Sequence, residues 1–169
     1  PKPRYLDISH DVNESDDEWG DGWTEFDDQS PKLKTTVTEE HPKSIINRNK
    51  SPDIPFEQSI NPYRGCEHGC IYCYARPAHA YVDLSPGLDF ESKLFCKPNA
   101  AELLRNELSR PKYRCSAISL GANTDAFQPT ERRMEISRSI IEVLRECNHP
   151  FTIVTKSSLV ERHRWQKRI

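Results

Sequence analysis

The sequence lacks any long run of apolar residues. No stretch approaches the roughly 18 residues that a membrane-spanning helix needs, and no charged segment followed by an apolar one opens the chain as a secretory leader would. A disulfide framework is also a poor fit, because three of the six cysteines crowd into one loop. These absences predict a cytoplasmic protein with no membrane partner.

Apolar residues are scarce overall. Of 169 residues, 35% are hydrophobic and 30% charged, and 13 are proline, so we expect the core in only part of the chain. Residues 1–60 carry 14 acidic and 7 basic side chains, whereas residues 61–169 carry 12 acidic and 17 basic ones. The interval from Asp7 to Asp28 has ten acidic residues and no Lys or Arg.

This distribution predicts an acidic, disordered segment over residues 1–50 and a core domain over residues 51–169. A solvated tail is one interpretation of the acidic segment. A segment that docks on a partner, or folds back over the basic body, is the other.

Three cysteines, Cys66, Cys70 and Cys73, lie within eight residues. Thiolates are soft ligands that select iron-sulfur clusters, zinc or copper(I). A structural zinc site needs four protein ligands, commonly two pairs, and no second cysteine pair exists. A 4Fe-4S cluster on three thiolates leaves one iron open to a small molecule, which favours a cluster with chemistry at the metal.

The Cys-x3-Cys-x2-Cys spacing, with Tyr72 directly before the last cysteine, resembles the signature of radical S-adenosylmethionine enzymes. The similarity extends through residues 59–65, 74–79 and 84–91, and it points to the branch that contains spore photoproduct lyase and the DNA repair photolyase-like proteins.

This resemblance implies that the three cysteines hold a 4Fe-4S cluster and that S-adenosylmethionine chelates the open iron, with Tyr72 beside the adenine. One electron from a flavodoxin- or ferredoxin-type reductant would then yield a 5'-deoxyadenosyl radical that abstracts hydrogen from a substrate. The family points to nucleic acid as a substrate class.

Apolar patterning predicts an α/β fold. The expected strands are residues 58–61, 92–96, 115–120 and 151–155, and the expected helices are 100–109 and 131–147. Alternation of strand and helix favours a parallel sheet. The resemblance implies a partial (β/α)6 barrel of the TIM type, with only the N-terminal strands present. Because the chain ends in a basic stretch, we expect a fragment or a frame-shifted end.

Local signals give finer expectations for the helices. Asn99 with Glu102 predicts a capping box, and Thr130 a cap. A short helix is expected near Gly69, with Pro77 ending or kinking it. The apolar stripe of the long helix is predicted to be buried, and it comprises Ile136, Ile140, Val143, Leu144 and Cys147.

Polar residues follow two of the expected strands, where ligands bind in parallel sheets. Residues 121–131 resemble the family's Thr-Asp-Pro-Tyr-Gln-Pro-x-Glu motif, although Ala126 and Phe127 replace its Pro and Tyr. Asn123, Thr124 and Asp125 are predicted to accept N–H bonds from the methionine amino group, and a tight turn with an Asx cap is the alternative.

The end of the next expected strand carries Thr155, Lys156 and Ser157, which suit a carboxylate or ribose contact. They complete the set of side chains predicted to bind S-adenosylmethionine.

Simpler interpretations remain open for several residues. The cysteine loop fits a zinc site completed by His68 or His79, and Arg76 and His79 fit either substrate contact or packing. The remaining cysteines are expected to be small buried residues, unless one donates hydrogen to a product radical; they are Cys96, Cys115 and Cys147.

The rival functions are therefore a radical enzyme, a non-catalytic zinc or DNA-binding module, and a cluster-binding fragment without turnover.

Overall fold

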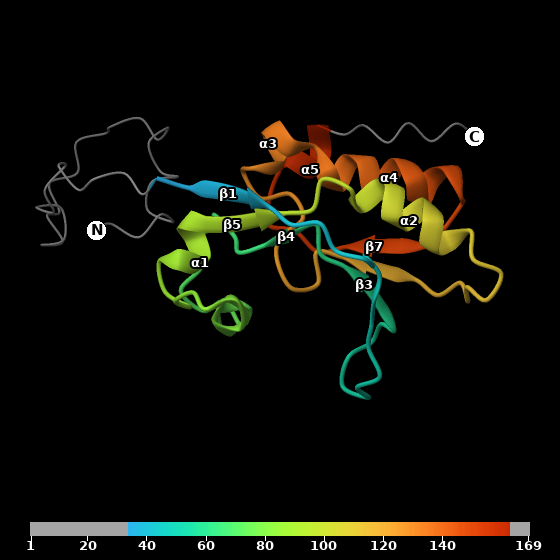
Figure 1. The fold of residues 1–169 in the computed structure, drawn as a ribbon, viewed down its shortest axis with the longest axis horizontal. Helices are drawn as coiled ribbons and strands as arrows, with labels where there is room; N and C mark the ends of the chain where they lie inside the picture. The colour runs from blue at the N-terminus through green and yellow to red at the C-terminus, as the bar shows by residue number, and fades with distance from the viewer. Residues whose placement is uncertain (1–33, 163–169) are drawn as a thin grey trace, which may run out of the picture.

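A computed structural model describes residues 34–162 (Figure 1). Short strands and helices alternate along this part of the chain. In order they are β1 (Thr36–Glu39), β2 (Asn47–Arg48), β3 (Gln58–Ile60), β4 (Tyr63–Arg64), the 3-10 helix η2 (Arg76–Val82), α1 (Asp89–Ser92), β5 (Lys93–Cys96), α2 (Ala100–Leu108), β6 (Ile118–Leu120), α3 (Glu131–Met134), α4 (Ile136–Glu146), β7 (Phe151–Ile153) and α5 (Leu159–Arg162).

The larger sheet has the order β2-β3-β6-β7. Its strands β3, β6 and β7 run parallel, with Ile60, Leu120 and Ile153 in register, and β2 adds an antiparallel edge. All three residues of β6 are buried, as predicted for a strand covered on both faces. The described part of the chain is therefore mixed α/β, with three parallel strands in a mixed sheet. The described strands form no closed barrel, and a partial barrel stays a prediction.

The strand expected over residues 92–96 forms as β5, but it lies in a second sheet and not in one parallel sheet with β6 and β7. β5 pairs in parallel with β1 and antiparallel with β4, so both of its edges are occupied. The chain turns at Pro62 between β3 and β4, and the Lys97 amide donates to the Pro62 carbonyl at 3.1 Å. This turn brings β4 alongside β5, so β3, and not β5, is the parallel neighbour of β6.

The predicted boundary after residue 50 does not hold. Residues 34–50 contribute β1 and β2 and two buried core side chains, Ile45 and Ile46, which are 2% and 8% exposed. The average composition of residues 1–50 concealed these contributions, because a few well-placed aliphatic residues are enough to anchor a segment against a core. The expectation of disorder for residues 1–33 lies outside the described residues.

The helix predicted over residues 131–147 is broken in two. Glu135 adopts a left-handed conformation (φ 50°) between α3 and α4. The Glu131 carboxylate accepts the Arg138 amide at 3.0 Å, so this side chain caps the first turn of α4 and stabilises the new start. Ile136 and the rest of the predicted stripe are buried, but Cys147 is exposed, because α4 ends at Glu146.

Helix α2 begins at Ala100 as predicted, but the capping box does not form. The Asn99 side chain makes no capping hydrogen bond, and its buried Oδ1 has no partner among the described residues. The Thr130 side chain likewise makes no capping bond to α3. Both residues occupy the predicted position at the helix start, so the sequence located the boundary without specifying its contacts.

One apolar core joins α2 and α4 to the larger sheet, and Figure 1 shows the two helices together beside β7. Leu104 of α2 and Ile140 and Leu144 of α4 are fully buried with Ile118 and Leu120 of β6. Burial of side chains of this size contributes about 1.5–3 kcal/mol each. The core therefore fixes the carboxyl ends of the parallel strands. None of the helices in residues 34–162 has the length and apolar character to cross a membrane.

Candidate functional site

The cysteine loop, residues 66–73, follows β4 near the carboxyl end of β3. Gly65 enters it with φ +79°, and a Cβ there would stand 2.7 Å from Leu94 Cδ2 and 2.8 Å from the Phe90 carbonyl oxygen. Only glycine combines that conformation with that lack of space. The Cys66 amide then donates to the Phe90 carbonyl at 2.9 Å. The chain is thereby held tightly where the first thiol is placed.

All three thiols of the loop are free and line one small cavity of about 180 Å³, which His68, Asp125 and Lys156 also line. Cys66 is buried, whereas Cys70 and Cys73 are half-buried. Gly121 and Val154, at the ends of β6 and β7, form the opposite wall. The cavity therefore sits at the carboxyl ends of the parallel strands, where sheets of this type bind ligands.

The donor set distinguishes two kinds of metal centre. Within residues 34–162, no three His, Cys, Asp or Glu side chains are arranged to hold one metal ion. Ligands of a single zinc ion must converge on one point at about 2.0–2.3 Å. A 4Fe-4S cluster instead takes each thiolate on a different iron, so its ligands need only surround a shared space. Three thiols around one cavity fit that second requirement.

The two histidines of the zinc alternative have other surroundings. His79 is fully buried, and its Nε2 lies 2.8 Å from the Lys93 carbonyl oxygen between the rings of Phe90 and Phe95. His68 Nε2 lies 3.2 Å from Asp125 Oδ2, at ion-pair distance without the direction of a hydrogen bond. His79 is a core residue. His68 is held against a carboxylate.

The Cys66 sulfur lies in a buried and polar setting. Burial raises the pKa of this thiol to about 12, and the amide groups of His68 and Asp125, which donate to the sulfur, offset part of that rise. A buried thiol of this kind stays protonated until a cationic centre stabilises its thiolate. The backbone already supplies two donors that would stabilise such a thiolate.

Lys156 brings a positive charge to the outer side of the loop. Its Nζ lies 3.0 Å from Cys70 Sγ, hydrogen-bonds the Tyr72 hydroxyl, and stands 4.6 Å from the centre of that ring. The hydrogen bond to Tyr72, and then the contact with Cys70, raise the pKa of Lys156 above its ordinary value. The lysine stays charged beside the Cys70 sulfur.

The outer side of the loop is open to solvent. We call it the rim, and it consists of Ile71, Tyr72 and Tyr74, which are 70%, 77% and 76% exposed. The Tyr74 hydroxyl donates to the Ala122 carbonyl, and this bond links the rim to the end of β6. Next to Tyr72 lies a larger cavity of about 610 Å³ that His68, Lys156 and Ser157 also line.

Residues 121–131 form what we call the brace. Three of its buried polar side chains reach the segment that leads into the cysteine loop. The Thr124 hydroxyl donates to the Tyr63 carbonyl at 2.8 Å. Gln128 donates to the Gly65 carbonyl at 3.1 Å and accepts the Glu67 amide at 3.0 Å.

Glu131 ends the brace with a bond of the same kind. Its carboxylate accepts the Tyr63 hydroxyl. Burial, and then the Glu131 charge, raise the pKa of Tyr63 far above its ordinary value, so the phenol remains a donor. The brace thus fixes the entry to the cysteine loop from the side of β6.

Asp125 joins three parts of the site. Its Oδ1 accepts the Phe127 amide at 2.8 Å and the Thr155 hydroxyl at 2.7 Å, and its Oδ2 accepts the Lys156 amide at 2.7 Å and faces His68. Burial favours a higher pKa, but the adjacent His68 ring and the bonds from the Lys156 amide and the Thr155 hydroxyl together lower the pKa of Asp125. The protein itself therefore supplies three hydrogen bonds and one close histidine contact to this carboxylate.

The structure brings most of the predicted site residues together. The small cavity is lined by Cys66, Cys70, Cys73, Asn123, Thr124, Asp125 and Thr155, and the larger one by Tyr72 and Ser157. Asn123 is held by its backbone amide, which donates to Asn61 Oδ1 at 2.8 Å. Ser157 Oγ accepts the Leu159 amide at 3.2 Å at the start of α5. Thr124, which is 3% exposed, is a structural contact.

Arg76 is committed to packing rather than to a free ligand contact. Its Nε donates to the Cys70 carbonyl at 2.9 Å, and its other nitrogens bond Gly87 and Glu91. The predicted helix near Gly69 is absent from the described chain, which turns there instead. Pro77 lies in the first turn of η2, so it begins this helix rather than ending one, because a missing N–H costs nothing at that position.

The other cysteines lie outside both cavities. Cys96 is buried as predicted. Cys115 and Cys147 are exposed, which corrects the expectation that all three are buried. The reason is that β6 begins only at Ile118 and α4 ends at Glu146, so both thiols fall in connecting segments.

The positioning roles of Tyr63, Gln128 and Glu131 were missed from the sequence. One signal could have found two of them. Thr124, Gln128 and Glu131 recur at positions i, i+4 and i+7, a spacing that favours one shared face, although residues 121–130 form turns rather than a helix. A polar face that follows a buried strand predicts hydrogen bonds to a neighbouring loop.

No family model and no solved structure matches the chain. It is 44% identical over 117 residues, 68% of its length, to uncharacterized proteins of Mycobacterium tuberculosis and Mycobacterium bovis. It is 31% identical over 120 residues, 71% of its length, to an uncharacterized protein of Methanocaldococcus jannaschii. The chain spans 34% of the mycobacterial proteins and 42% of the archaeal one.

Proposed function

We propose that this chain binds a 4Fe-4S cluster through Cys66, Cys70 and Cys73 and binds S-adenosylmethionine beside it. One observation carries the proposal: three free thiols with Cys-x3-Cys-x2-Cys spacing surround one cavity at the carboxyl ends of parallel strands. When bound and reduced by a flavodoxin- or ferredoxin-type protein, such a cluster supplies the electron that converts S-adenosylmethionine to a 5'-deoxyadenosyl radical.

The chain's own residues divide into holding and contact roles in this proposal. Tyr72, at the exposed rim, is suited to lie against the adenine, since an aromatic face stacks on any base. Asn123 is the brace residue whose side-chain amide makes no hydrogen bond to the described residues, and it is suited to the methionine amino group. Thr155 and Ser157 stand at the end of β7, where a carboxylate or ribose contact is proposed.

Asp125 is assigned a positioning role. Its carboxylate accepts three hydrogen bonds, from Phe127, Thr155 and Lys156, and lies against the His68 ring, so it orients Thr155 and His68 rather than taking up a ligand. Hydrogen abstraction from a substrate is the proposed outcome, and nucleic acid is the substrate class to which the sequence resemblance points. The excess of basic residues after residue 60 agrees with an anionic substrate.

Anaerobic reconstitution with iron and sulfide tests the cluster. The full chain should become brown and bind about four irons, with an absorbance band at about 400 nm. Serine at any of Cys66, Cys70 or Cys73 should abolish the band. Cys115→Ser and Cys147→Ser, which change exposed thiols elsewhere, should leave it intact. Stoichiometric zinc without iron would overturn the proposal in favour of a zinc module.

Turnover is tested separately. Reduction with dithionite in the presence of S-adenosylmethionine should release 5'-deoxyadenosine from the reconstituted chain, measured beside one of the longer relatives. A full cluster without that product would overturn the enzymatic part and assign the chain a cluster-binding role alone.

A further inference from the structure

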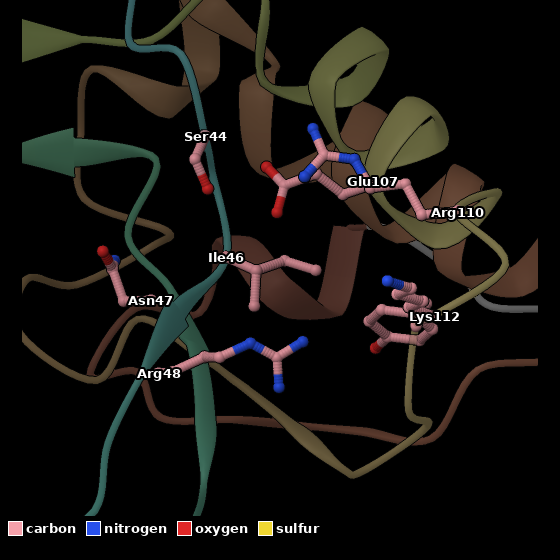
Figure 2. Close-up of a pocket in the computed structure, with 8 residues that line it drawn as sticks. Ser44, Ile46, Asn47, Arg48, Glu107, Arg110 and Lys112 are labelled. Carbon is pink, nitrogen blue, oxygen red and sulfur yellow. The ribbon is translucent and has the colours of Figure 1, made fainter.

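A separate pocket lies near the amino end of β3, away from the two cavities of the cysteine site. It has a volume of about 520 Å³ and is formed where β2 meets the end of α2 and the segment before β6 (Figure 2). Arg48 pairs with Gln58 at the amino end of β3, whereas the cysteine loop follows the carboxyl end. No residue lines both this pocket and the two cavities of the cysteine site.

Three cations reach into this pocket. Arg48 comes from β2, and Arg110 and Lys112 follow α2; Figure 2 shows Arg48 and Lys112 approaching from opposite sides, with Arg110 along another edge. None of the three forms a salt bridge with an acidic group in the described part of the chain. Their combined charge is therefore available to a ligand.

One acidic residue in the pocket wall offsets only part of that charge. Glu107 is 8% exposed, and its Oε1 accepts the Ile45 amide at 2.6 Å. This bond holds the segment that precedes β2 and leaves the carboxylate with its single negative charge. With three cations and one committed carboxylate, the lining carries excess positive charge.

An apolar surface lies between the cations. Ile46, which is 8% exposed, lines the pocket together with Tyr113. The Tyr113 hydroxyl donates to Gln58 Oε1 at 2.9 Å and lies 2.6 Å from His149 Nε2, so the ring is held in place from behind. A fixed aromatic ring is a stacking platform for a planar group, because little conformational entropy is lost when the ligand binds.

We propose that this pocket binds a nucleotide unit, either free or at the end of a nucleic acid strand. Arg48, Arg110 and Lys112 would contact the phosphates, since guanidinium and ammonium groups make charge-assisted hydrogen bonds to phosphate oxygens. Tyr113 and Ile46 would contact the base. The volume of about 520 Å³ lies within the 300–1,000 Å³ that is usual for small-molecule sites.

Titration calorimetry on the full chain tests this proposal with ADP, pyrophosphate and adenosine as probes. ADP and pyrophosphate should bind, and adenosine should bind at least about tenfold more weakly than ADP. Replacing Arg48, Arg110 and Lys112 together with Gln should weaken ADP binding by at least about thirtyfold. The matched control replaces Arg105, Arg133 and Arg145 with Gln and should leave the affinity within about twofold.

The aromatic contact has its own readout. Tyr113→Leu should weaken ADP binding about tenfold while leaving pyrophosphate unchanged, whereas Tyr113→Phe should retain ADP binding because it keeps the ring. A short oligonucleotide with a 5'-phosphate, compared with ADP, distinguishes a strand end from a free nucleotide. Absence of ADP binding, or equal affinity in the triple variant and its control, would overturn the proposal, whatever the outcome of cluster reconstitution.

Discussion

The brace and the rim contact the same cysteine loop in opposite ways. In the brace, Thr124, Gln128 and Glu131 are at most 6% exposed, and each makes a hydrogen bond to residues 63–67. In the rim, Ile71, Tyr72 and Tyr74 are at least 70% exposed, and Lys156 contacts Tyr72. One side of the loop is fixed by the fold. The other is left free to meet a ligand.

This difference explains how a short sheet can position a loop that carries few contacts of its own. Buried hydrogen bonds are costly to break, because each group left without a partner loses about 1–3 kcal/mol. Exposed contacts cost little to break, because water replaces them. Substitutions in the brace should therefore act on stability, and substitutions in the rim on ligand binding.

The largest loss of stability is expected at Gly65, where the chain enters the cysteine loop. Gly65→Ala places a methyl group 2.7 Å from Leu94 Cδ2 and 2.8 Å from the Phe90 carbonyl, in a backbone conformation that alanine disfavours. The free energy of unfolding, measured with urea, should fall by about 3 kcal/mol or more. Gly87→Ala is the control, because its Cβ would approach only Ser85 Oγ at 3.3 Å, and it should change stability by about 0.5 kcal/mol or less. Equal losses in the two variants would contradict this account.

The next effect tests the brace itself. Gln128→Leu keeps the side-chain volume but leaves the Gly65 carbonyl and the Glu67 amide without their partner. Urea unfolding should show a loss of about 2–3 kcal/mol. Asn106→Leu, on the exposed face of α2, serves as the control and should stay within about 0.5 kcal/mol of the wild type. A loss no greater than that of the control would mean that the brace does not stabilise the loop.

A smaller, pH-dependent effect is expected at Glu131. Burial raises the pKa of this carboxyl, and the bonds from Tyr63 and the backbone offset only part of the rise. A carboxyl with a raised pKa in the folded state contributes stability below its unfolded pKa, and that contribution is lost as pH rises through the folded value. The stability of Glu131→Gln relative to the wild type should therefore increase from about pH 4 to pH 7.

Urea midpoints across that range measure the difference at Glu131. Glu142→Gln, at an exposed position of α4, should give a flat difference over the same range. If the stability of Glu131→Gln relative to the wild type decreased as pH rises, the proposed direction of the Glu131 pKa shift would be wrong.

The smallest effect on stability is expected at the rim. Tyr72→Leu and Lys156→Met should each change the free energy of unfolding by about 0.5 kcal/mol or less, because both side chains are exposed. S-adenosylmethionine binding to the reconstituted protein, measured by equilibrium dialysis, should weaken about tenfold. Tyr81→Leu changes a tyrosine that is 88% exposed elsewhere and should preserve binding. A large loss of stability in Tyr72→Leu would mean that the rim, like the brace, stabilises the fold.

Much of the local structure could be predicted from the sequence. The apolar runs of β6 and β7 and the start of α2 were found because hydrophobic periodicity and helix-start residues act over a few neighbours. The break at Glu135 was not, because the apolar stripe of Ile136 to Leu144 begins only after it and gives no signal of where the helix starts. That break depends on Glu131, which caps α4 through the Arg138 amide from across the bend.

The candidate site was predicted in the same uneven way. Spacing alone placed Cys66, Cys70 and Cys73 in one loop, and strand order alone placed Thr124, Asp125 and Thr155 beside it. Whether each of these side chains is free or already bonded could not be predicted. Asp125 is a residue type that often binds ligands, yet its carboxylate already contacts Phe127, Thr155 and His68. These three partners lie in different segments of the chain.

The sequence by itself determined the cysteine loop, the three parallel strands and the acidic and basic parts of the chain, since each is a property of near neighbours or of composition. Tertiary structure alone decided that β5 leaves the parallel sheet, that residues 34–50 join the fold, and that Arg48 meets Lys112 in a second pocket. Contacts between residues about 60 positions apart produce these outcomes, and no local pattern encodes which distant group will fill a given bond.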